Sequence, residues 1–271
     1  MADTRYTALV LAATRGGPRD PLAQAGGVSH KAFIDLAGTP MLRRVVEGVI
    51  DSGRVGHVIV SIEQDSMDEA RQILNGLGGR LPITYTASKE SIGASAAAVT
   101  EEYAEAVPMI ITTADNGLHD GPVVKAFCDG LDTVEVDAAL GLTDARYVLD
   151  KYPDGARAFH RFRDGAFSSC NLYAFLSPKA FKGAAVFNGG GQFGKKPKRL
   201  IGAFGLIAFL VYKSRLVKVR PFIRFLSRAI GVKTEPVFLP FAEGPIDIDR
   251  MSDWELAERI LRERERAATS G

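Results

Sequence analysis

The stretch that decides the fold of this 271-residue chain reads Leu11-Ala12-Ala13-Thr14-Arg15-Gly16-Gly17-Pro18-Arg19. It ends an apolar run that begins at Tyr6, and its glycines make a turn. A turn of this kind exposes backbone N–H groups that bind anions, and Lys31 lies close enough along the chain to reach the same place. The stretch Gly38-Thr39-Pro40-Met41-Leu42 then opens the next apolar segment. This order predicts the phosphate-binding end of a nucleotide site, although an ordinary strand-to-helix turn would need the same glycines.

Beyond this turn, runs typical of strands alternate with runs typical of helices. The strand-like runs are 6–12, 57–62, 83–86, 109–113 and 138–142, and the helix-like runs are 41–52, 66–77, 91–104 and 122–131. The first and fourth strand-like runs are nearly continuous in apolar residues, as in strands covered on both faces. We therefore predict an α/β fold of the doubly wound class, with helices on both faces of a mostly parallel sheet. Ligands bind at the carboxyl ends of such strands, so the loop after Ala12 and the turn after Thr113 should share one rim.

The second half of the chain alternates less regularly. We expect strands over 166–175 and 235–239, and a last helix over 252–266 that begins with a capping box of Ser252 and Glu255. With 271 residues and 46% hydrophobic residues, the chain is long enough to bury the core of one large domain. We predict a single domain over residues 1–271, in which 183–234 is a basic, apolar helical insert.

Charge is distributed unevenly, although the net charge is only +2. Residues 165–234 contain 13 Lys and Arg and no Asp or Glu, which leaves 21 basic and all 32 acidic residues elsewhere. Within this block Arg220, Arg224 and Arg228 recur every four residues beside apolar positions. A basic amphipathic helix too short to span a bilayer suits peripheral contact with an anionic membrane or a lipid substrate, which is one of two interpretations of 195–233. The alternative is an insert that packs on the core or forms a homodimer. Nucleic acid is not expected as a partner, because no recognised binding motif accompanies the basic residues.

The cysteines and the first residues of the sequence indicate the cellular compartment in which the protein is expected. Cys128 and Cys170 lie far apart without a metal-binding spacing, which is typical of reduced thiols. The sequence begins with Met-Ala-Asp-Thr-Arg-Tyr, which does not fit a secretory signal. We expect a cytoplasmic protein that is peripheral at the inner face of the membrane if the basic block binds lipid.

Carboxylates follow the fourth strand-like run and precede the last helix. Asp115 comes after that run with only Ala114 between them, on the predicted rim, where a carboxylate can bind Mg²⁺. Turn chemistry alone would also explain the sequence Asp115-Asn116-Gly117. Asp247 and Asp249 have one residue between them, so in extended backbone only one of the two should face a metal. Asp253 lies at the start of the last helix, and we assign it to helix stabilisation.

The arrangement from Leu11 to Leu42 resembles the signature of MobA-like nucleotidyltransferases, the molybdenum-cofactor guanylyltransferase type, and of their sugar-phosphate and polyol-phosphate relatives. Their pattern is Leu-Ala-Ala-Gly-x-Gly-x-Arg, then Lys, then Gly-x-Pro followed by Leu or Met, on a Rossmann-like fold of the GT-A type. Thr14 replaces the first of these glycines, and Pro18 moves the arginine to Arg19, with Arg15 as its rival. The resemblance implies transfer of a nucleoside monophosphate from a triphosphate to a phosphorylated acceptor, with release of pyrophosphate.

The same resemblance implies a role for each matching residue. Lys31 with Arg15 or Arg19 would counter the charge of the triphosphate. The residues implied in nucleotide binding are Leu11, Ala12, Ala13, Thr14, Gly16, Gly17, Gly93 and Ser95. Asp115 and Asp249 would hold Mg²⁺, with Asp247 as the alternate, and Asn171 would meet the acceptor. From the relatives we expect CTP as the nucleotide and a small phosphorylated alcohol or sugar as the acceptor, in lipid head-group or envelope synthesis.

Two other functions remain open at this point. A glycosyltransferase of the same broad fold would use Asp247-Ile248-Asp249 as its metal motif, although such a motif normally lies at mid-chain. A catalytically decayed, membrane-associated nucleotide-binding protein would explain Thr14. Residues 189–196 match glycine-rich phosphate-binding patterns, but Lys196 and Pro197 do not fit either pattern, and we interpret the segment as a loop. His30 and His119 lie near the predicted site residues in sequence, but a lone histidine is more often incidental.

Overall fold

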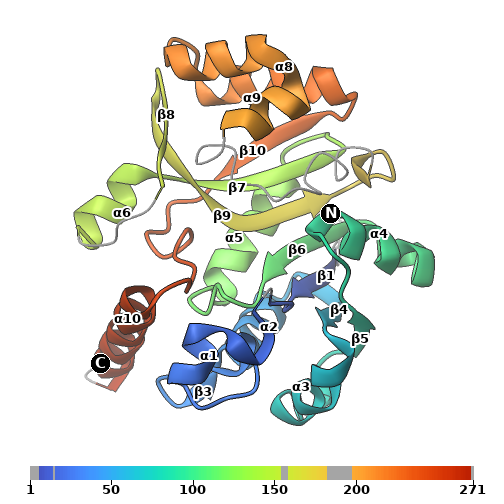
Figure 1. Ribbon diagram of the computed structural model, residues 1–271, viewed down its shortest axis with the longest axis vertical. Helices are drawn as coiled ribbons and strands as arrows, with labels where there is room; N and C mark the ends of the chain where they lie inside the picture. The colour runs from blue at the N-terminus through green and yellow to red at the C-terminus, as the bar shows by residue number, and fades with distance from the viewer. Residues whose placement is uncertain (1–5, 15, 154–157, 182–196, 270–271) are drawn as a thin grey trace.

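The structure, a computed structural model, describes residues 6–14, 16–153, 158–181 and 197–269. Its centre is one twisted sheet with helices packed on both faces (Figure 1). The strands are β1 (Tyr6–Leu11), β4 (Val55–Ile62), β5 (Ile83–Ala87), β6 (Met109–Thr113), β7 (Ala138–Asp144), β8 (His160–Phe162), β9 (Gly165–Phe175) and β10 (Thr234–Phe238), with a separate hairpin of β2 (Asp35–Leu36) and β3 (Thr39–Pro40).

The order of strands across the sheet is β10-β7-β9-β6-β1-β4-β5, and β8 pairs with β9. Strands β1, β4, β5 and β6 are parallel neighbours, as are β7 and β10. Only β9 breaks the pattern within the main path, because it runs antiparallel to both β6 and β7. The predicted α/β class with a mostly parallel sheet is confirmed, and β9 makes the sheet mixed.

Helices cover the two faces of the sheet. They are α1 (Pro21–Ala25), α2 (Met41–Asp51), α3 (Met67–Ile73), α4 (Ile92–Glu102), α5 (Gly121–Leu131), α6 (Ala145–Lys151), α8 (Pro197–Ser214), α9 (Val219–Ile230) and α10 (Met251–Thr269). Alternate residues of β1 serve opposite faces: Ala8 and Val10 lie in the core with α2, α3 and α5, whereas Leu9 and Leu11 pack with α4. This period-two burial explains why the first strand reads as continuously apolar.

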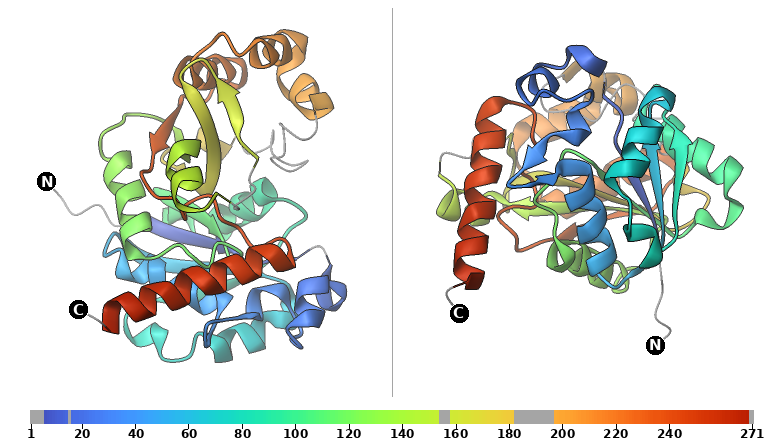
Figure 2. Two further views of the ribbon diagram at one scale, coloured as in Figure 1. Left: turned by 90° about the vertical axis from the view of Figure 1, so that its left-hand side faces the viewer. Right: turned by 90° about the horizontal axis from the view of Figure 1, so that it is seen from below.

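The last helix packs beside the first part of the chain. Leu256, Ala257 and Ile260 of α10 form a core cluster with Leu22 of α1 and Leu36 of β2, and Figure 2 shows α10 running alongside this segment. The segment between β10 and α10 is thereby brought back to the rim of the sheet, next to residues from the amino-terminal half.

The predicted start of this last helix was wrong. The helix begins at Met251, so Ser252 lies inside its first turn and does not cap it. The side chain of Asp253 accepts hydrogen bonds from the backbone N–H groups of Asp249 and Arg250, at 3.1 Å each. Asp253 therefore satisfies free N–H groups at the helix start, the task that the capping box was expected to perform.

Helices α8 and α9 lie at the β10 end of the sheet (Figure 1). The backbone of α8 is kinked at Gly205, which has a positive φ of 82°. In α9, Arg220 and Arg224 both form ion pairs with Glu235, which is buried in β10. The predicted basic stripe was therefore wrong in part, because two of its three arginines are ion-paired with an acid of the fold. Glu235, which pairs with both arginines, comes directly after the acid-free block 165–234.

No helix within the described residues is long and apolar enough to cross a membrane. The predicted loop over 189–196, with its glycine-rich patterns, lies outside the described residues.

Candidate functional site

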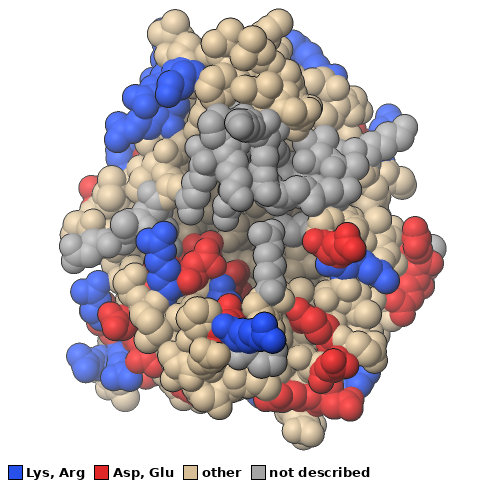
Figure 3. All heavy atoms as spheres, in the orientation of Figure 1, with Lys and Arg blue, Asp and Glu red and all other residues tan. Residues whose placement is uncertain are grey.

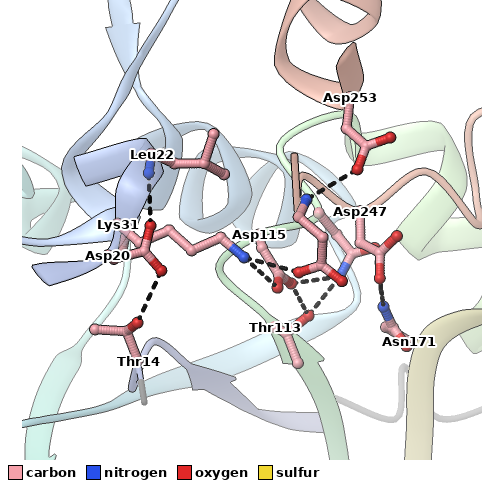
Figure 4. A network of polar contacts seen from close by, with 12 residues as sticks. Thr14, Asp20, Leu22, Lys31, Thr113, Asp115, Asn171, Asp247 and Asp253 are labelled. Atoms are coloured by element: carbon pink, nitrogen blue, oxygen red, sulfur yellow. Dashed lines mark hydrogen bonds and ion pairs between the residues drawn. The ribbon is translucent and has the colours of Figure 1, made fainter. Parts of the chain in front are cut away.

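Three charged residues predicted from separate parts of the sequence meet on one rim. The Lys31 ammonium lies 3.3 Å from Oδ2 of Asp115 and 2.9 Å from Oδ1 of Asp249 (Figure 4). Lys31 begins a short 3-10 turn after β1, Asp115 follows β6, and Asp249 lies in the segment before α10. Residues separated by 84 and 218 positions in the sequence are thus joined through one ammonium group.

Asp115 is held by its neighbours at the end of β6. The Thr113 hydroxyl donates to Oδ1 of Asp115 at 2.5 Å, and Nδ2 of Asn116 donates to the same oxygen at 3.2 Å. The backbone N–H of Ile248 donates to the Asp115 carbonyl at 2.9 Å. This last bond ties the backbone that carries Asp247 and Asp249 to the backbone that carries Asp115.

The Lys31 side chain is only 14% exposed, which makes its charge state depend on its partners. Burial alone would lower the pKa of Lys31, but the carboxylates of Asp115 and Asp249 outweigh that effect and raise the pKa above its ordinary value. The ammonium therefore stays charged at neutral pH. A permanent cation beside two acids is suited to electrostatic work and not to proton transfer.

Asp247 and Asp249 have different partners, as the extended-backbone argument predicts. Asp249 contacts Lys31, whereas Oδ2 of Asp247 lies 3.5 Å from Nδ2 of Asn171 on β9 (Figure 4). Asn171 has a positive φ of 51°, unusual in the middle of a strand, and its amide also lies 3.5 Å from Oδ1 of Asn116. A non-glycine residue held in this conformation is typical of functional sites.

The glycine-rich loop is fixed by an acid that sequence inspection missed. Oε1 of Glu63, directly after β4, accepts the backbone N–H of Thr14 at 2.9 Å, and Oε2 lies 3.0 Å from Nε2 of His30. Since Nδ1 of His30 accepts the N–H of Ala32 at 3.0 Å, Nε2 carries the proton that is donated to Glu63. Burial alone would raise the pKa of Glu63, but the bonds from His30 and Thr14 lower it. Glu63 thus joins the loop to the turn that carries Lys31.

A signal for Glu63 was present in the sequence. It directly follows the strand-like run 57–62, just as Asp115 follows 109–113, and the carboxyl ends of parallel strands share a rim. His30 was noted only as a lone histidine, and its role became visible through its contacts.

Replacement of glycine by Thr14 does not block the path of the loop. Thr14 is absent from the positive-φ residues of the described chain, whereas Gly17 has a φ of 51°. The left-handed conformation thus falls on a glycine that tolerates it. A Cβ at Gly16 would lie 3.1 Å from Cα of Asp20, so this second glycine permits a close approach.

The remaining predicted residues differ in how they lie. Leu11 and Ala12 are buried, whereas Ala13, Gly16 and Arg19 are exposed. Gly93 and Ser95 are buried in α4, where the Ser95 hydroxyl accepts the backbone N–H of Lys89 at 3.0 Å. Arg15 lies outside the described residues. His119 is buried, and its Nε2 donates to the Gly244 carbonyl at 2.8 Å, which agrees with the interpretation of this histidine as incidental to the site.

The donor set suits a hard cation only in part. Among the described residues no three His, Cys, Asp or Glu side chains converge on one point as a complete metal site. Asp115 and Asp249 nevertheless converge on a cation, the Lys31 ammonium. Mg²⁺ is commonly held by one or two carboxylates while waters and substrate phosphates supply its other ligands. Two carboxylates on the rim beside the glycine-rich loop fit that arrangement.

Comparison with known proteins agrees with this geometry. A model of the MobA-like NTP transferase domain matches residues 8–202. The chain belongs to this family. As a MobA-like nucleotidyltransferase it is an enzyme of the transferase class, and the match includes Lys31, Glu63 and Asp115. Asp247 and Asp249 lie beyond its end.

Curated relatives match a shorter part of this MobA-like chain. The 2-C-methyl-D-erythritol 4-phosphate cytidylyltransferases of Rhodococcus opacus (strain B4) and Rhodococcus jostii (strain RHA1) are 39% and 38% identical to it over 78 residues. These regions cover 28% of this chain and 32% of each relative, so the chain spans about a third of the length of the curated relatives it matches.

Solved structures share the fold over nearly the whole chain. A hypothetical transferase from Thermus thermophilus superposes with a TM-score of 0.71 at 21% identity and covers 93% of this chain and 100% of its own. A 4-diphosphocytidyl-2C-methyl-D-erythritol synthase from Anaerococcus prevotii DSM 20548 gives a TM-score of 0.59 at 13% identity, with coverage of 96% and 99%. At these identities the likeness concerns the fold alone.

Proposed function

We propose that the chain transfers a nucleoside monophosphate, from CTP in preference, to a small phosphorylated alcohol or sugar and releases pyrophosphate. The observation that carries this proposal is the Lys31 ammonium placed between Asp115 and Asp249, beside the glycine-rich loop after β1. We further propose that residues 1–271 form a single nucleotidyltransferase domain, in which 183–234 is an insert.

The residues fit this chemistry because the nucleophile needs no general base. A phosphate group is already ionised near neutral pH, so the barrier to its attack on the α-phosphorus falls through positioning and charge neutralisation. Lys31, with Arg15 or Arg19, would counter the charge of the triphosphate. The backbone N–H groups of Gly16 and Gly17 would bind phosphate oxygens at the loop.

Mg²⁺ is the cation that we propose for Asp115 and Asp249, with Asp247 as the alternate ligand. When bound there, it would supply neutralisation of the negative charge on the phosphates. The chain's own part is to hold the two carboxylates at a fixed spacing through the Ile248 to Asp115 backbone bond, and to place Lys31 beside them.

The nucleotide and the acceptor are proposed from the names of the curated relatives and from the position of Asn171. The names of the curated relatives support CTP and a phosphorylated polyol, but they match only 28% of this chain. Asn171 supports an acceptor site, because its strained backbone directs the side-chain amide toward Asn116 and Asp247. A product in lipid head-group or envelope synthesis would suit the basic helices described below.

The direct test incubates the pure protein with each of the four nucleoside triphosphates, Mg²⁺ and a panel of phosphorylated polyols and sugars. Release of pyrophosphate that depends on the acceptor is the expected result, fastest with CTP. Release of a nucleoside diphosphate from a nucleotide-sugar would favour the glycosyltransferase instead. Triphosphate binding without turnover on any acceptor would favour the decayed, membrane-associated protein.

A further inference from the structure

Helix α8 carries large apolar side chains on its solvent-exposed side. After the kink at Gly205, Leu206, Ile207 and Leu210 are 57%, 69% and 56% exposed, and Leu216 in the turn that follows is 74% exposed. Leu206 and Leu210 are one turn apart, so they lie on the same side of the helix. We name Leu206, Ile207, Leu210 and Leu216 the α8 apolar face. Residues of this size exposed together mark an interaction surface.

Basic residues follow the α8 apolar face along the chain and continue on α9, which packs against α8 through the rings of Phe222 and Tyr212. Lys213, Arg215, Lys218 and Arg228 are all exposed, and none of them forms an ion pair with another described residue. This sets them apart from Arg220 and Arg224, which are paired with Glu235. Figure 3 shows the same end of the molecule, where an uncharged tip has Lys and Arg on either side.

Two occupants could cover this apolar face, a second copy of the chain or a membrane, and the absence of acidic residues from 165–234 decides between them. Residues 165–234 contain no Asp or Glu. In a twofold-symmetric dimer the same patch meets itself, so its basic residues would face those of the second copy. A membrane with anionic lipids offers both an apolar interior for the leucines and a negative surface for the lysines and arginines.

We propose that the α8 apolar face and the basic residues Lys213, Arg215, Lys218 and Arg228 dock the protein on the surface of an anionic lipid membrane. The leucine and isoleucine side chains enter the acyl boundary while the basic side chains stay at the head groups. Helix α9 holds α8 in place, because its buried Phe222 packs against Tyr212 of α8 and two of its arginines pair with Glu235 of β10. The inference does not depend on the nucleotidyl-transfer proposal.

The test is flotation of the full chain with vesicles of phosphatidylcholine alone or with a third of phosphatidylglycerol. Wild-type protein is expected to float with the anionic vesicles at low salt, to lose at least tenfold in partitioning at high salt, and to stay behind with neutral vesicles. The variant Leu206→Gln, Ile207→Gln, Leu210→Gln should lose at least tenfold in partitioning to anionic vesicles. Its thermal midpoint should match that of wild type, because the replaced side chains are exposed.

A matched control replaces exposed apolar residues elsewhere. Tyr147→Gln with Leu149→Gln changes exposed positions of α6 and should float as wild type does. Reversal of charge in Lys213→Glu with Arg228→Glu should abolish flotation as well. Equal flotation of the triple variant and wild type would overturn the proposal. So would a wild-type dimer in light scattering that the triple variant converts to monomer, without binding of either protein to vesicles.

Discussion

The rim around Lys31 and the end formed by α8 and α9 treat charge in opposite ways. On the rim, Lys31 is balanced by Asp115 and Asp249, and Glu63 is bonded to His30 and Thr14. At the α8 end, Glu235 pairs with Arg220 and Arg224, but no acidic partner within the described residues pairs with Lys213, Arg215, Lys218 or Arg228. A charged side chain that already has an ion-pair partner binds a ligand by exchanging that partner for the ligand. A charged side chain without a partner in the protein can be neutralised only by another molecule. The difference teaches that the two regions are built for different kinds of contact.

The largest expected effect comes from removal of one acid on the rim. Asp115→Asn keeps the size of the side chain and an oxygen that accepts the Thr113 hydroxyl, so the fold should be unchanged by circular dichroism. Turnover, measured as pyrophosphate release, should fall about a thousandfold because one charge of the cation site is lost. Asp65→Asn, an exposed acid after β4, is the control and should keep wild-type turnover. Wild-type activity in Asp115→Asn would remove the metal assignment.

Replacement of Lys31 tests whether the ammonium occupies the place of a metal ion. Lys31→Met should lower turnover about a hundredfold, because a charge that counters the triphosphate is lost. In the absence of nucleotide the same variant should bind Mn²⁺ more tightly than wild type, because no ammonium then competes for Asp115 and Asp249.

Electron paramagnetic resonance of free Mn²⁺ measures this affinity without any turnover. Lys125→Met, which removes an exposed lysine of α5 that pairs with Asp129, is the control. Weaker Mn²⁺ binding in Lys31→Met would show that the ammonium does not compete with the metal.

Stability of the segment that carries Asp247 and Asp249 should depend on Glu243. This carboxylate is buried and accepts hydrogen bonds from Lys151 and the Tyr152 hydroxyl at 2.6 Å each. Burial alone would raise its pKa, but these bonds and Arg264 lower the pKa to about 2. Glu243→Gln should lower the free energy of unfolding at pH 7 by about 2 kcal/mol, less than the full shift implies because Lys151 is exposed to solvent.

The pH dependence of that loss has a defined sign. The pKa of Glu243 is lower in the folded protein than the value of 4.5 taken for an unperturbed glutamate. Its contribution to stability is therefore complete above pH 4.5 and is lost as the pH falls toward 2. Urea denaturation of wild type and Glu243→Gln should show a gap that closes over this range. A gap that is constant with pH would mean that the carboxylate charge is not what stabilises the segment.

The smallest effect is expected at Glu63, which touches the loop and not the phosphates. Glu63→Gln still offers an oxygen to the Thr14 N–H but loses the charge-assisted bond from His30. We expect KM for the triphosphate to rise about tenfold while kcat changes less, because the loop and Lys31 are less well positioned. Glu69→Gln, whose carboxylate bonds only Ser29 in the described chain, is the control. A fall in kcat as large as the rise in KM, or no change in either, would contradict a positioning role.

Much of the fold was predictable because a strand that is buried on both faces has a nearly continuous apolar sequence. Strands β1 and β6 read as continuous apolar runs, and the rule that ligands gather at their carboxyl ends selected Asp115 and the loop at Thr14. The direction of β9 was not predictable, since the alternation within a strand is the same whether its neighbours are parallel or antiparallel.

Side-chain partners were the least predictable part. Ser252 and Glu255 match the capping-box pattern, yet Asp253 accepts the hydrogen bonds from the backbone at the helix start. Several residues in this segment could cap the helix, and the sequence does not show which one has the right geometry. Arg220 and Arg224 have no acidic residue near them within their own helix. Their partner, Glu235, belongs to the next strand, β10, and only the fold brings it beside them. The roles of Lys31, Asp249 and Asn171 stay predictions, although the structure brings these residues to one rim.

The bond from the Ile248 N–H to the Asp115 carbonyl bears on how the protein is made. Strands β1, β4, β5 and β6 can assemble as soon as residue 113 has left the ribosome, but the second acid of the rim arrives more than a hundred residues later. Until then Lys31 has only one carboxylate beside it. A growing chain therefore contains these strands well before it contains a finished site, so premature termination would leave the rim without its second acid.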